Sequence, residues 1–145
     1  MREKTLLLIK PDGVVRGLAN EIKRRVKTAD LKIIGSKAIQ VSREQAKELY
    51  SVHADKPFYA GLIKFITSGL IVANVVEGEA AIVRLRELMG ATDPREAVAG
   101  TIRGDLKEEN IFTADKAIKN LVHGSDSQEA AARELTIFFG GKNEN

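Results

Sequence analysis

The stretch LIVANVVEG, residues 70–78, gives the clearest strand signal in the chain. It is a short apolar run that is rich in β-branched residues, a composition that is typical of strands. The Ser68-Gly69 pair directly before it ends the preceding segment and separates the two. We therefore predict a strand at 70–78, around which the remaining elements can be placed.

The segments on both sides of this strand have helical patterns. PFYAGLIKFIT (57–67) opens with a proline, which favours the first turn of a helix. EAAIVRLRELMG (79–90) ends in a glycine, the residue that most often follows the last helical turn. Both stretches are predicted to be helices.

Further strands and helices lie outward from this centre. Short apolar runs predict strands at residues 4–9 (KTLLLI, ended by the Pro-Asp-Gly turn), 31–41 and 119–124. Periodic apolar positions and a Ser42/Gln45 capping box predict helices at 18–29, 42–50 and 127–139, with loop-rich chain at 91–117. This order predicts an α+β fold: a ferredoxin-like four-stranded antiparallel sheet (βαββαβ) covered by helices.

Composition and charge narrow the class of protein. The 145 residues, 43% hydrophobic and 30% charged, predict a single domain over 1–145, with a flexible tail at 140–145. The net charge is +3, with interspersed signs, which suits a phosphate-bearing molecule as well as nucleic acid. The absence of cysteine excludes disulfides, thiolate metal sites and a cysteine nucleophile. No apolar run reaches membrane-spanning length, so we expect a cytoplasmic protein.

One of only two histidines lies beside a predicted helix start. In NLVHGSDSQEAAAREL (120–135), Asp126 is expected to cap that helix. Glu134 borders the apolar stripe of the helix, so its carboxylate is expected to lie behind His123. A carboxylate in that position fixes the tautomer of the ring and makes it a usable nucleophile or general base. The residues alone leave a structural role for His123 open.

Several cationic and polar side chains occur at strand ends and in loops, where binding sites gather. Lys10 ends the first strand, Arg103 lies between glycines in GTIRGD (100–105), and Arg86 and Thr92 flank the end of a helix. Together they suit phosphate oxygens, although each one alone is an ordinary surface residue. The chain contains no P-loop motif and no histidine spacing typical of metal sites.

The complete motif set resembles the nucleoside diphosphate kinase family over about residues 3–139. The matching stretches include LIKPDGV (8–14), KPFYAGL (56–62), GATDP (90–94), GTIRGD (100–105) and NLVHGSDS (120–127). The resemblance implies a ping-pong transfer of the γ-phosphoryl group of a nucleoside triphosphate to a nucleoside diphosphate, through a phosphohistidine at His123.

The resemblance also implies roles for individual residues. Glu134 would accept a hydrogen bond from the ring nitrogen that is not phosphorylated, with Ser125 supporting it. Asn120 would bind the ribose hydroxyls, and Phe58 would stack on any base. The expected phosphate ligands are Lys10, Tyr50, Arg86, Thr92 and Arg103.

The resemblance further implies a metal and an assembly. Mg²⁺ would enter with the nucleotide, held mainly by phosphate oxygens, with Asp126 nearby. The expected partners are nucleoside di- and triphosphates such as ATP and GDP, without a membrane, in a homo-oligomer that is a hexamer or a tetramer. The alternative is a ferredoxin-like nucleotide- or nucleic-acid-binding regulatory module without kinase activity.

The segment between residues 105 and 120 departs from the family pattern. DLKEENIFTADKAIKN is several residues longer than the resemblance leads us to expect. We expect an extended loop or a hairpin here, just before the last strand. Because the motifs on both sides of the segment are intact, we expect the site to be intact as well.

Overall fold

Four strands form one antiparallel sheet in the order β2-β3-β1-β4. Their bounds are β1 Arg2–Ile9, β2 Lys32–Gln40, β3 Leu70–Glu79 and β4 Val122–Gly124. The computed structural model describes residues 1–140, so most of the tail expected at 140–145 lies outside the described residues. The strand order and the antiparallel pairing confirm the ferredoxin-like α+β fold.

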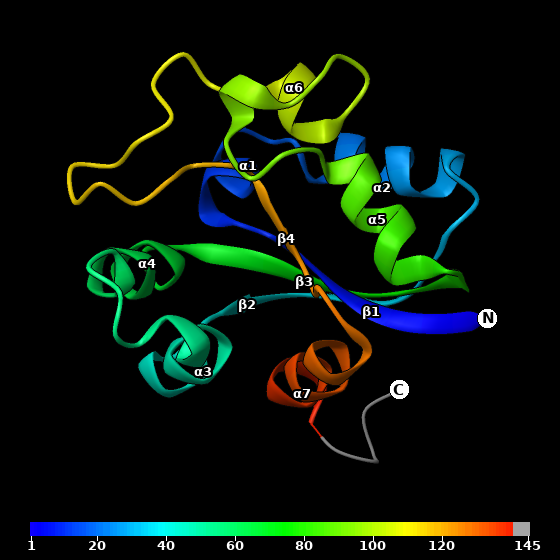
Figure 1. Ribbon diagram of the computed structural model, residues 1–145, viewed down its shortest axis with the longest axis horizontal. Helices are drawn as coiled ribbons and strands as arrows, with labels where there is room; N and C mark the ends of the chain where they lie inside the picture. Colours follow the sequence, from blue (N-terminus) through cyan, green and yellow to red (C-terminus); the bar gives the residue numbers. More distant parts are fainter. Residues whose placement is uncertain (141–145) are drawn as a thin grey trace.

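Helices cover both faces of this sheet, as Figure 1 shows, with α2, α5 and α6 on one side and α3 and α7 on the other. The α-helices are α1 Pro11–Val15, α2 Ala19–Thr28, α3 Arg43–Leu49, α4 Tyr59–Ile66, α5 Ala81–Met89, α6 Ile102–Leu106 and α7 Gln128–Phe139. Two short 3-10 helices are η1 Ser51–His53 and η2 Pro94–Glu96.

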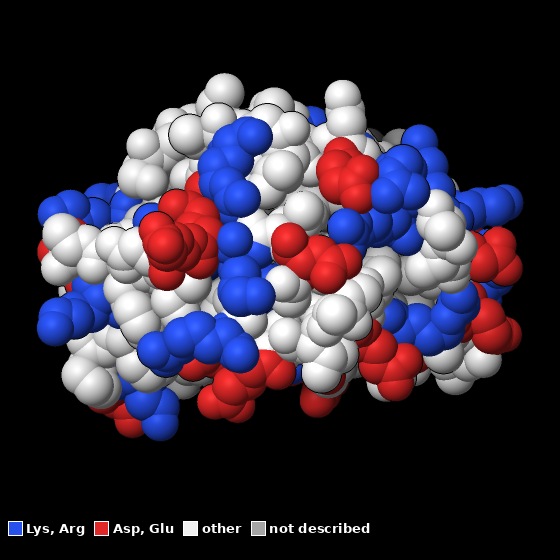
Figure 2. Space-filling model, turned by 90° about the horizontal axis from the view of Figure 1, so that it is seen from above, with Lys and Arg blue, Asp and Glu red and all other residues white. Residues whose placement is uncertain are grey.

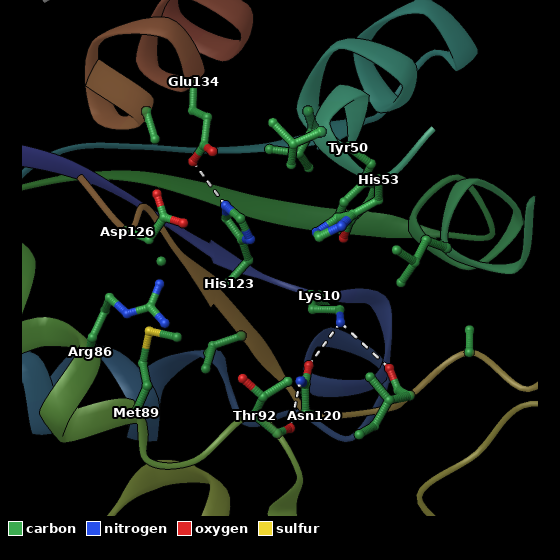
Figure 3. Close-up of a pocket in the computed structure, with 18 of the residues that line it drawn as sticks. Lys10, Tyr50, His53, Arg86, Met89, Thr92, Asn120, His123, Asp126 and Glu134 are labelled. Atoms are coloured by element: carbon green, nitrogen blue, oxygen red, sulfur yellow. Dashed lines mark hydrogen bonds and ion pairs between the residues drawn. The ribbon is translucent and has the colours of Figure 1, made fainter. Parts of the chain in front are cut away.

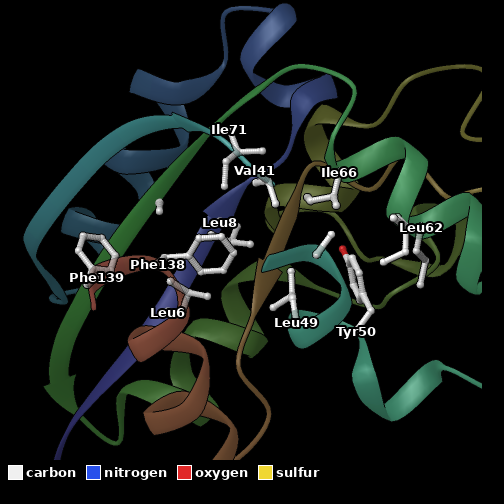
Figure 4. Close-up of a cluster of buried hydrophobic side chains, with 13 residues drawn as sticks. Leu6, Leu8, Val41, Leu49, Tyr50, Leu62, Ile66, Ile71, Phe138 and Phe139 are labelled. Atoms are coloured by element: carbon white, nitrogen blue, oxygen red, sulfur yellow. The ribbon is translucent and has the colours of Figure 1, made fainter. Parts of the chain in front are cut away.

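Strand β1 contributes to two hydrophobic cores because alternate residues of a strand point to opposite faces. Leu6 and Leu8 lie in a core with residues of α3, α4 and α7, including Phe138 (Figure 4). Leu7 and Ile9 lie in the core on the other face, with residues of α2 and α5. All four side chains are fully buried, so β1 is the strand that ties the two layers of helices together.

The observed helix cap agrees with the sequence-based prediction at α3 and differs from it at α7. Ser42 and Gln45 form the predicted capping box, with both hydrogen bonds present. The prediction that Asp126 caps α7 is wrong: Ser127 is the cap, and its hydroxyl accepts a hydrogen bond from the Ala130 amide at 3.0 Å. Asp126 thereby stays outside the helix, with its carboxylate free to face solvent.

Other element bounds also differ from prediction. The helix expected from Pro57 begins two residues later, at Tyr59, because the chain first makes a turn. The Pro-Asp-Gly turn after β1 opens the short helix α1, and the loop-rich 91–117 region contains η2 and α6. The last strand begins only at Val122, because Leu121 has a φ of 75° and interrupts the extended backbone.

The long segment before β4 folds back on itself, as expected of a loop or hairpin. Phe112 and Ile118 form an isolated antiparallel bridge, and Lys119 pairs with Glu108 at 3.1 Å. The bend rests on α4, where a Cβ added to Gly61 would come within 2.9 Å of the Asp115 carbonyl oxygen. Close contact with a helix therefore fixes where this segment lies.

Charged side chains are mixed over the surface. Figure 2 shows Lys and Arg beside Asp and Glu across the face that is seen from above, as the interspersed charges of the sequence predict. Among residues 1–140, the helices are all too short or too polar to cross a membrane.

The cap assignment predicts different stabilities for two neighbouring variants. Ser127→Ala removes the acceptor for the Ala130 amide, so it should lower the free energy of unfolding by about 1 kcal/mol. Asp126→Ala removes no cap, so it should change that free energy by less than about 0.5 kcal/mol. Urea unfolding of both variants checks this, and a larger loss in Asp126→Ala than in Ser127→Ala would contradict it.

Candidate active site

A cavity of about 920 Å³ opens where β1 ends and the antiparallel β4 begins, between α3 and α4 on one side and α5 on the other (Figure 3). Nearly all of the residues that the sequence predicted for the site line it. They are Lys10, Tyr50, Phe58, Arg86, Thr92, Arg103, Asn120, His123, Asp126 and Glu134. Ser125 is buried behind the wall of the cavity rather than in it.

His123 is held by a carboxylate on α7. Its Nε2 lies 2.8 Å from Glu134 Oε1, and the Ser125 hydroxyl donates to the same oxygen at 2.7 Å. The Glu134 side chain is 5% exposed and that of His123 is 22% exposed. Glu134 and Ser125 therefore form a buried bracket behind a ring that reaches the cavity.

This bracket determines which ring nitrogen is reactive. Burial opposes ionisation of Glu134, but hydrogen bonds from His123 and Ser125 outweigh it, and the pKa of Glu134 falls below its ordinary value. An ionised Glu134 accepts a proton that the ring carries on Nε2. Nδ1 then keeps its lone pair, so it is the ring nitrogen that is chemically able to act as a nucleophile.

Lys10 and Asn120 are linked on the opposite wall. Lys10 Nζ donates to Asn120 Oδ1 at 2.8 Å, and Asn120 Nδ2 donates to the Thr92 carbonyl at 2.9 Å. Burial of the ammonium and the nearby Arg103 lower the pKa of Lys10 to about 8, against the opposing effect of Asp12. The wall thus holds a desolvated cation that an anion in the cavity would stabilise.

Arg103 is fixed mainly by the backbone. Its guanidinium donates to the carbonyls of Asn120 at 3.0 Å, Gly90 at 2.9 Å and Val122 at 2.7 Å. Burial first, and then repulsion from Arg86, lower its pKa to about 10. Of its five N–H groups, two remain for a ligand, while the exposed Arg86 faces the cavity without these constraints.

Aromatic side chains form the side of the cavity near α4. Tyr50 packs edge-on to the His123 ring, with the two ring centroids 6.4 Å apart. Burial raises the pKa of the Tyr50 hydroxyl. Phe58 is 43% exposed, so one face of its ring is open to a planar ligand. His53, for which the sequence predicts no role, packs against Phe58, with the two ring centroids 5.5 Å apart.

Further residues of the cavity are not predicted by the sequence patterns. His53, Phe112 and Lys116 line it, the last two from the folded-back segment. The rarity of histidine could have drawn attention to His53, but no local pattern links Phe112 to the site. Its position depends on tertiary contacts such as the stacking of Arg95 over its ring at 5.5 Å.

No cluster of three or more histidine, aspartate or glutamate side chains suitable for a metal occurs within residues 1–140. Asp126 is an exposed carboxylate on the cavity wall, close to His123 in Figure 3. A hard cation prefers oxygen ligands, and one carboxylate supplies too few of them alone. A metal here therefore needs a ligand that brings its own oxygen atoms.

Comparison with known proteins agrees with this geometry. Residues 3–143 match the nucleoside diphosphate kinase family. The nucleoside diphosphate kinase of Rubrobacter xylanophilus is 55% identical, over 96% of this chain and 99% of its own. That of Nocardia farcinica is 52% identical, over 96% of each chain.

Solved structures show the same likeness. A Halobacterium salinarum nucleoside diphosphate kinase in complex with CDP has a TM-score of 0.89 and 44% identity, over 99% of this chain and 91% of its own. A Borrelia burgdorferi enzyme with bound vanadate and ADP, a transition state mimic, has a TM-score of 0.90 and 35% identity, over 99% and 89%.

The fold, the bracketed histidine and the cationic cavity define a phosphotransferase. The chain belongs to the nucleoside diphosphate kinase family. Its activity is the one that names the family, phosphoryl transfer from a nucleoside triphosphate to a nucleoside diphosphate. These relatives match over nearly the full chain, which favours the enzyme over a binding module without kinase activity.

The lowered pKa of Glu134 predicts a pH-dependent contribution to stability. Because the folded pKa lies below the unfolded one, the contribution is complete above about pH 5 and is lost as pH falls through the folded pKa. At pH 7, Glu134→Gln should lower the free energy of unfolding by about 1–3 kcal/mol. That deficit should shrink towards about pH 3.

Unfolding by urea at several pH values measures this deficit. Glu129→Gln, an exposed glutamate in the first turn of the same helix, is the matched control and should show little deficit at any pH. A deficit for Glu134→Gln that is equal at neutral and acidic pH would show that the charged hydrogen bond is not its source.

Proposed function

We propose that His123 carries the phosphoryl group in a ping-pong reaction. Nδ1 attacks the γ-phosphorus of a nucleoside triphosphate, the bond to the bridging oxygen breaks, and the nucleoside diphosphate leaves with that oxygen. A terminal oxygen of the acceptor diphosphate then attacks the phosphohistidine and the P–N bond breaks. The observation that carries this proposal is the Nε2–Glu134 hydrogen bond of 2.8 Å, which leaves Nδ1 as the nucleophile.

Glu134 and Ser125 hold the ring during both steps. As the P–N bond forms, positive charge develops on the imidazole, and the adjacent buried carboxylate stabilises it. Ser125 donates to Glu134 at 2.7 Å and restricts that carboxylate to one orientation. The same arrangement serves both half-reactions, because they are near mirror images.

The remaining walls suit the parts of a nucleotide. Lys10, Tyr50, Arg86, Thr92 and Arg103 surround the space in front of His123 and would hold the phosphates. Asn120 would bind the ribose hydroxyls, and the exposed face of Phe58 would stack on the base. Stacking does not depend on base identity, so we propose a broad range of nucleoside di- and triphosphates, ATP and GDP among them.

Mg²⁺ fits this site as a companion of the nucleotide. The phosphates would supply most of its ligands, with the Asp126 carboxylate close by. When bound, the ion would neutralise part of the charge on the phosphates. We also propose a homo-oligomer, a hexamer or a tetramer, in the cytoplasm. β2 is an edge strand of the sheet, and an edge strand can pair with a second copy.

Intact mass spectrometry tests the phosphohistidine. Incubation with ATP and Mg²⁺, without an acceptor, should add one phosphoryl group that is labile to acid and that GDP removes. His123→Ala should give no adduct. If the wild-type protein gives no adduct, or if the adduct persists in His123→Ala, the proposed nucleophile is wrong.

The pKa of Lys10, about 8, predicts how nucleotide binding depends on pH. Above that pKa the ammonium loses its proton and its attraction for phosphate, so the affinity for ADP should fall about tenfold between about pH 7.5 and about pH 9.5. Lys10→Arg keeps its charge throughout this range, so its affinity should stay level. Calorimetric titration with ADP measures both, and an equal decline in the two proteins would exclude Lys10 as the cause.

A further inference from the structure

Leu121 adopts a backbone conformation that a leucine rarely has. Its φ is 75°, in the left-handed region, and the Val122 amide donates to the Asn120 carbonyl at 2.8 Å, which closes a three-residue turn. Turns of this kind with a positive central φ are rare and strained. A β-branched or bulky residue persists in such a conformation only where its surroundings hold it there.

The backbone of Leu121 is held on both sides by the end of β1 and the start of α1. The Leu121 amide donates to Asp12 Oδ2 at 3.0 Å, and its carbonyl accepts from the Lys10 amide at 2.8 Å. The contact with Asp12 spans 109 positions in the sequence, and both partners are buried. The carboxylate of Asp12 is therefore the side chain that fixes the central residue of the turn.

Arg103 holds the first and the last residue of the turn. It donates to the carbonyls of Asn120 and Val122, at 3.0 Å and 2.7 Å. The side chains of Arg103 and Asp12 differ in one respect that matters for function. Arg103 lines the cavity, whereas Asp12 does not. Asp12 can therefore affect a ligand in the cavity only indirectly, through the backbone that it holds and through its negative charge, which raises the pKa of Lys10 and of Arg103.

The turn separates two side chains that must face one ligand. Asn120, which begins the turn, reaches Lys10 Nζ at 2.8 Å on one wall of the cavity. His123, two residues after Leu121, reaches Glu134 on the other wall. A change of backbone conformation at Leu121 would rotate these two side chains relative to each other, since only Val122 lies between Leu121 and His123.

We propose that Asp12 is a positioning residue, whose carboxylate holds the Leu121 turn so that Asn120 and His123 face the same nucleotide. This rests on the proposed function, in which His123 is the nucleophile and Asn120 binds the ribose. Asp12 leaves the reactivity of the His123 ring itself unchanged, because that ring is oriented by Glu134. Removal of the Asp12 carboxylate therefore displaces His123 from the nucleotide, but His123 itself stays reactive.

Two phosphoryl donors distinguish positioning from a general loss of structure. ATP needs both Asn120 and His123, whereas phosphoramidate, a small donor without a nucleoside, needs only the nitrogen of His123. In Asp12→Ala, phosphorylation of the enzyme by ATP should slow by about 100-fold, the size of effect that a misplacement of about 1 Å produces. The rate with phosphoramidate should match that of the wild-type protein.

Conservative and control variants complete the experiment. Asp12→Asn keeps an oxygen that can accept from the Leu121 amide, so it should recover at least about a tenth of the wild-type rate with ATP. Glu3→Ala is the matched control, because Glu3 Oε1 accepts from the distant Ile82 amide at 3.1 Å but lies away from the cavity. Its ratio of ATP to phosphoramidate rates should equal that of the wild-type protein.

The possible outcomes separate the proposal from its premise. If Asp12→Ala lowers both rates equally, or lowers neither, positioning by Asp12 is refuted. If wild-type protein is not phosphorylated at His123 by either donor, the proposed function itself fails. If circular dichroism shows that Asp12→Ala does not fold, the same two rates are compared in Asp12→Ser. This variant withdraws the acceptor but keeps a polar group.

Discussion

The burial of β1 on both of its faces is the constraint on which the rest of the structure depends. Leu6, Leu7, Leu8 and Ile9 are fully buried, and each such side chain contributes about 1.5–3 kcal/mol. Helices on both sides of the sheet bury both sets of side chains, one set in each core. The polar residues directly after Ile9 therefore lie in the interior of the protein, at the edge of the cavity.

The interior position of these polar groups is the physical basis for proposing that the site binds anions. Lys10 and Arg103 are both buried, and burial lowers both of their pKa values. Their nearest buried carboxylate, Asp12, is engaged by the Leu121 amide. The two cations thus stay incompletely neutralised in a low-dielectric wall, where the phosphates of the proposed nucleotide would interact with them more strongly than at an exposed surface.

Short sequence patterns are sufficient to predict the features that depend on residues close together in the chain. The capping box of Ser42 and the pairing of His123 with Glu134 follow from short spacings and from helical periodicity, and the structure contains both. The α7 cap was assigned to the wrong residue, because aspartate and serine cap equally well and only the observed backbone distinguishes them. The turn at Leu121 left no signal, since a leucine does not indicate a positive φ and its partners lie more than 100 positions away.

The folded-back segment before β4, which the sequence predicts to be longer than the family pattern, is held in place by contacts of its own. Its two arms are joined by the Phe112–Ile118 bridge and by the ion pair of Lys119 with Glu108, so the segment closes near its own ends. Lengthening a surface loop that closes in this way costs little entropy. Its bend packs on Gly61, where a larger side chain would collide with the Asp115 carbonyl. The bend is thus held against α4, and Arg103 anchors the chain directly where the segment ends.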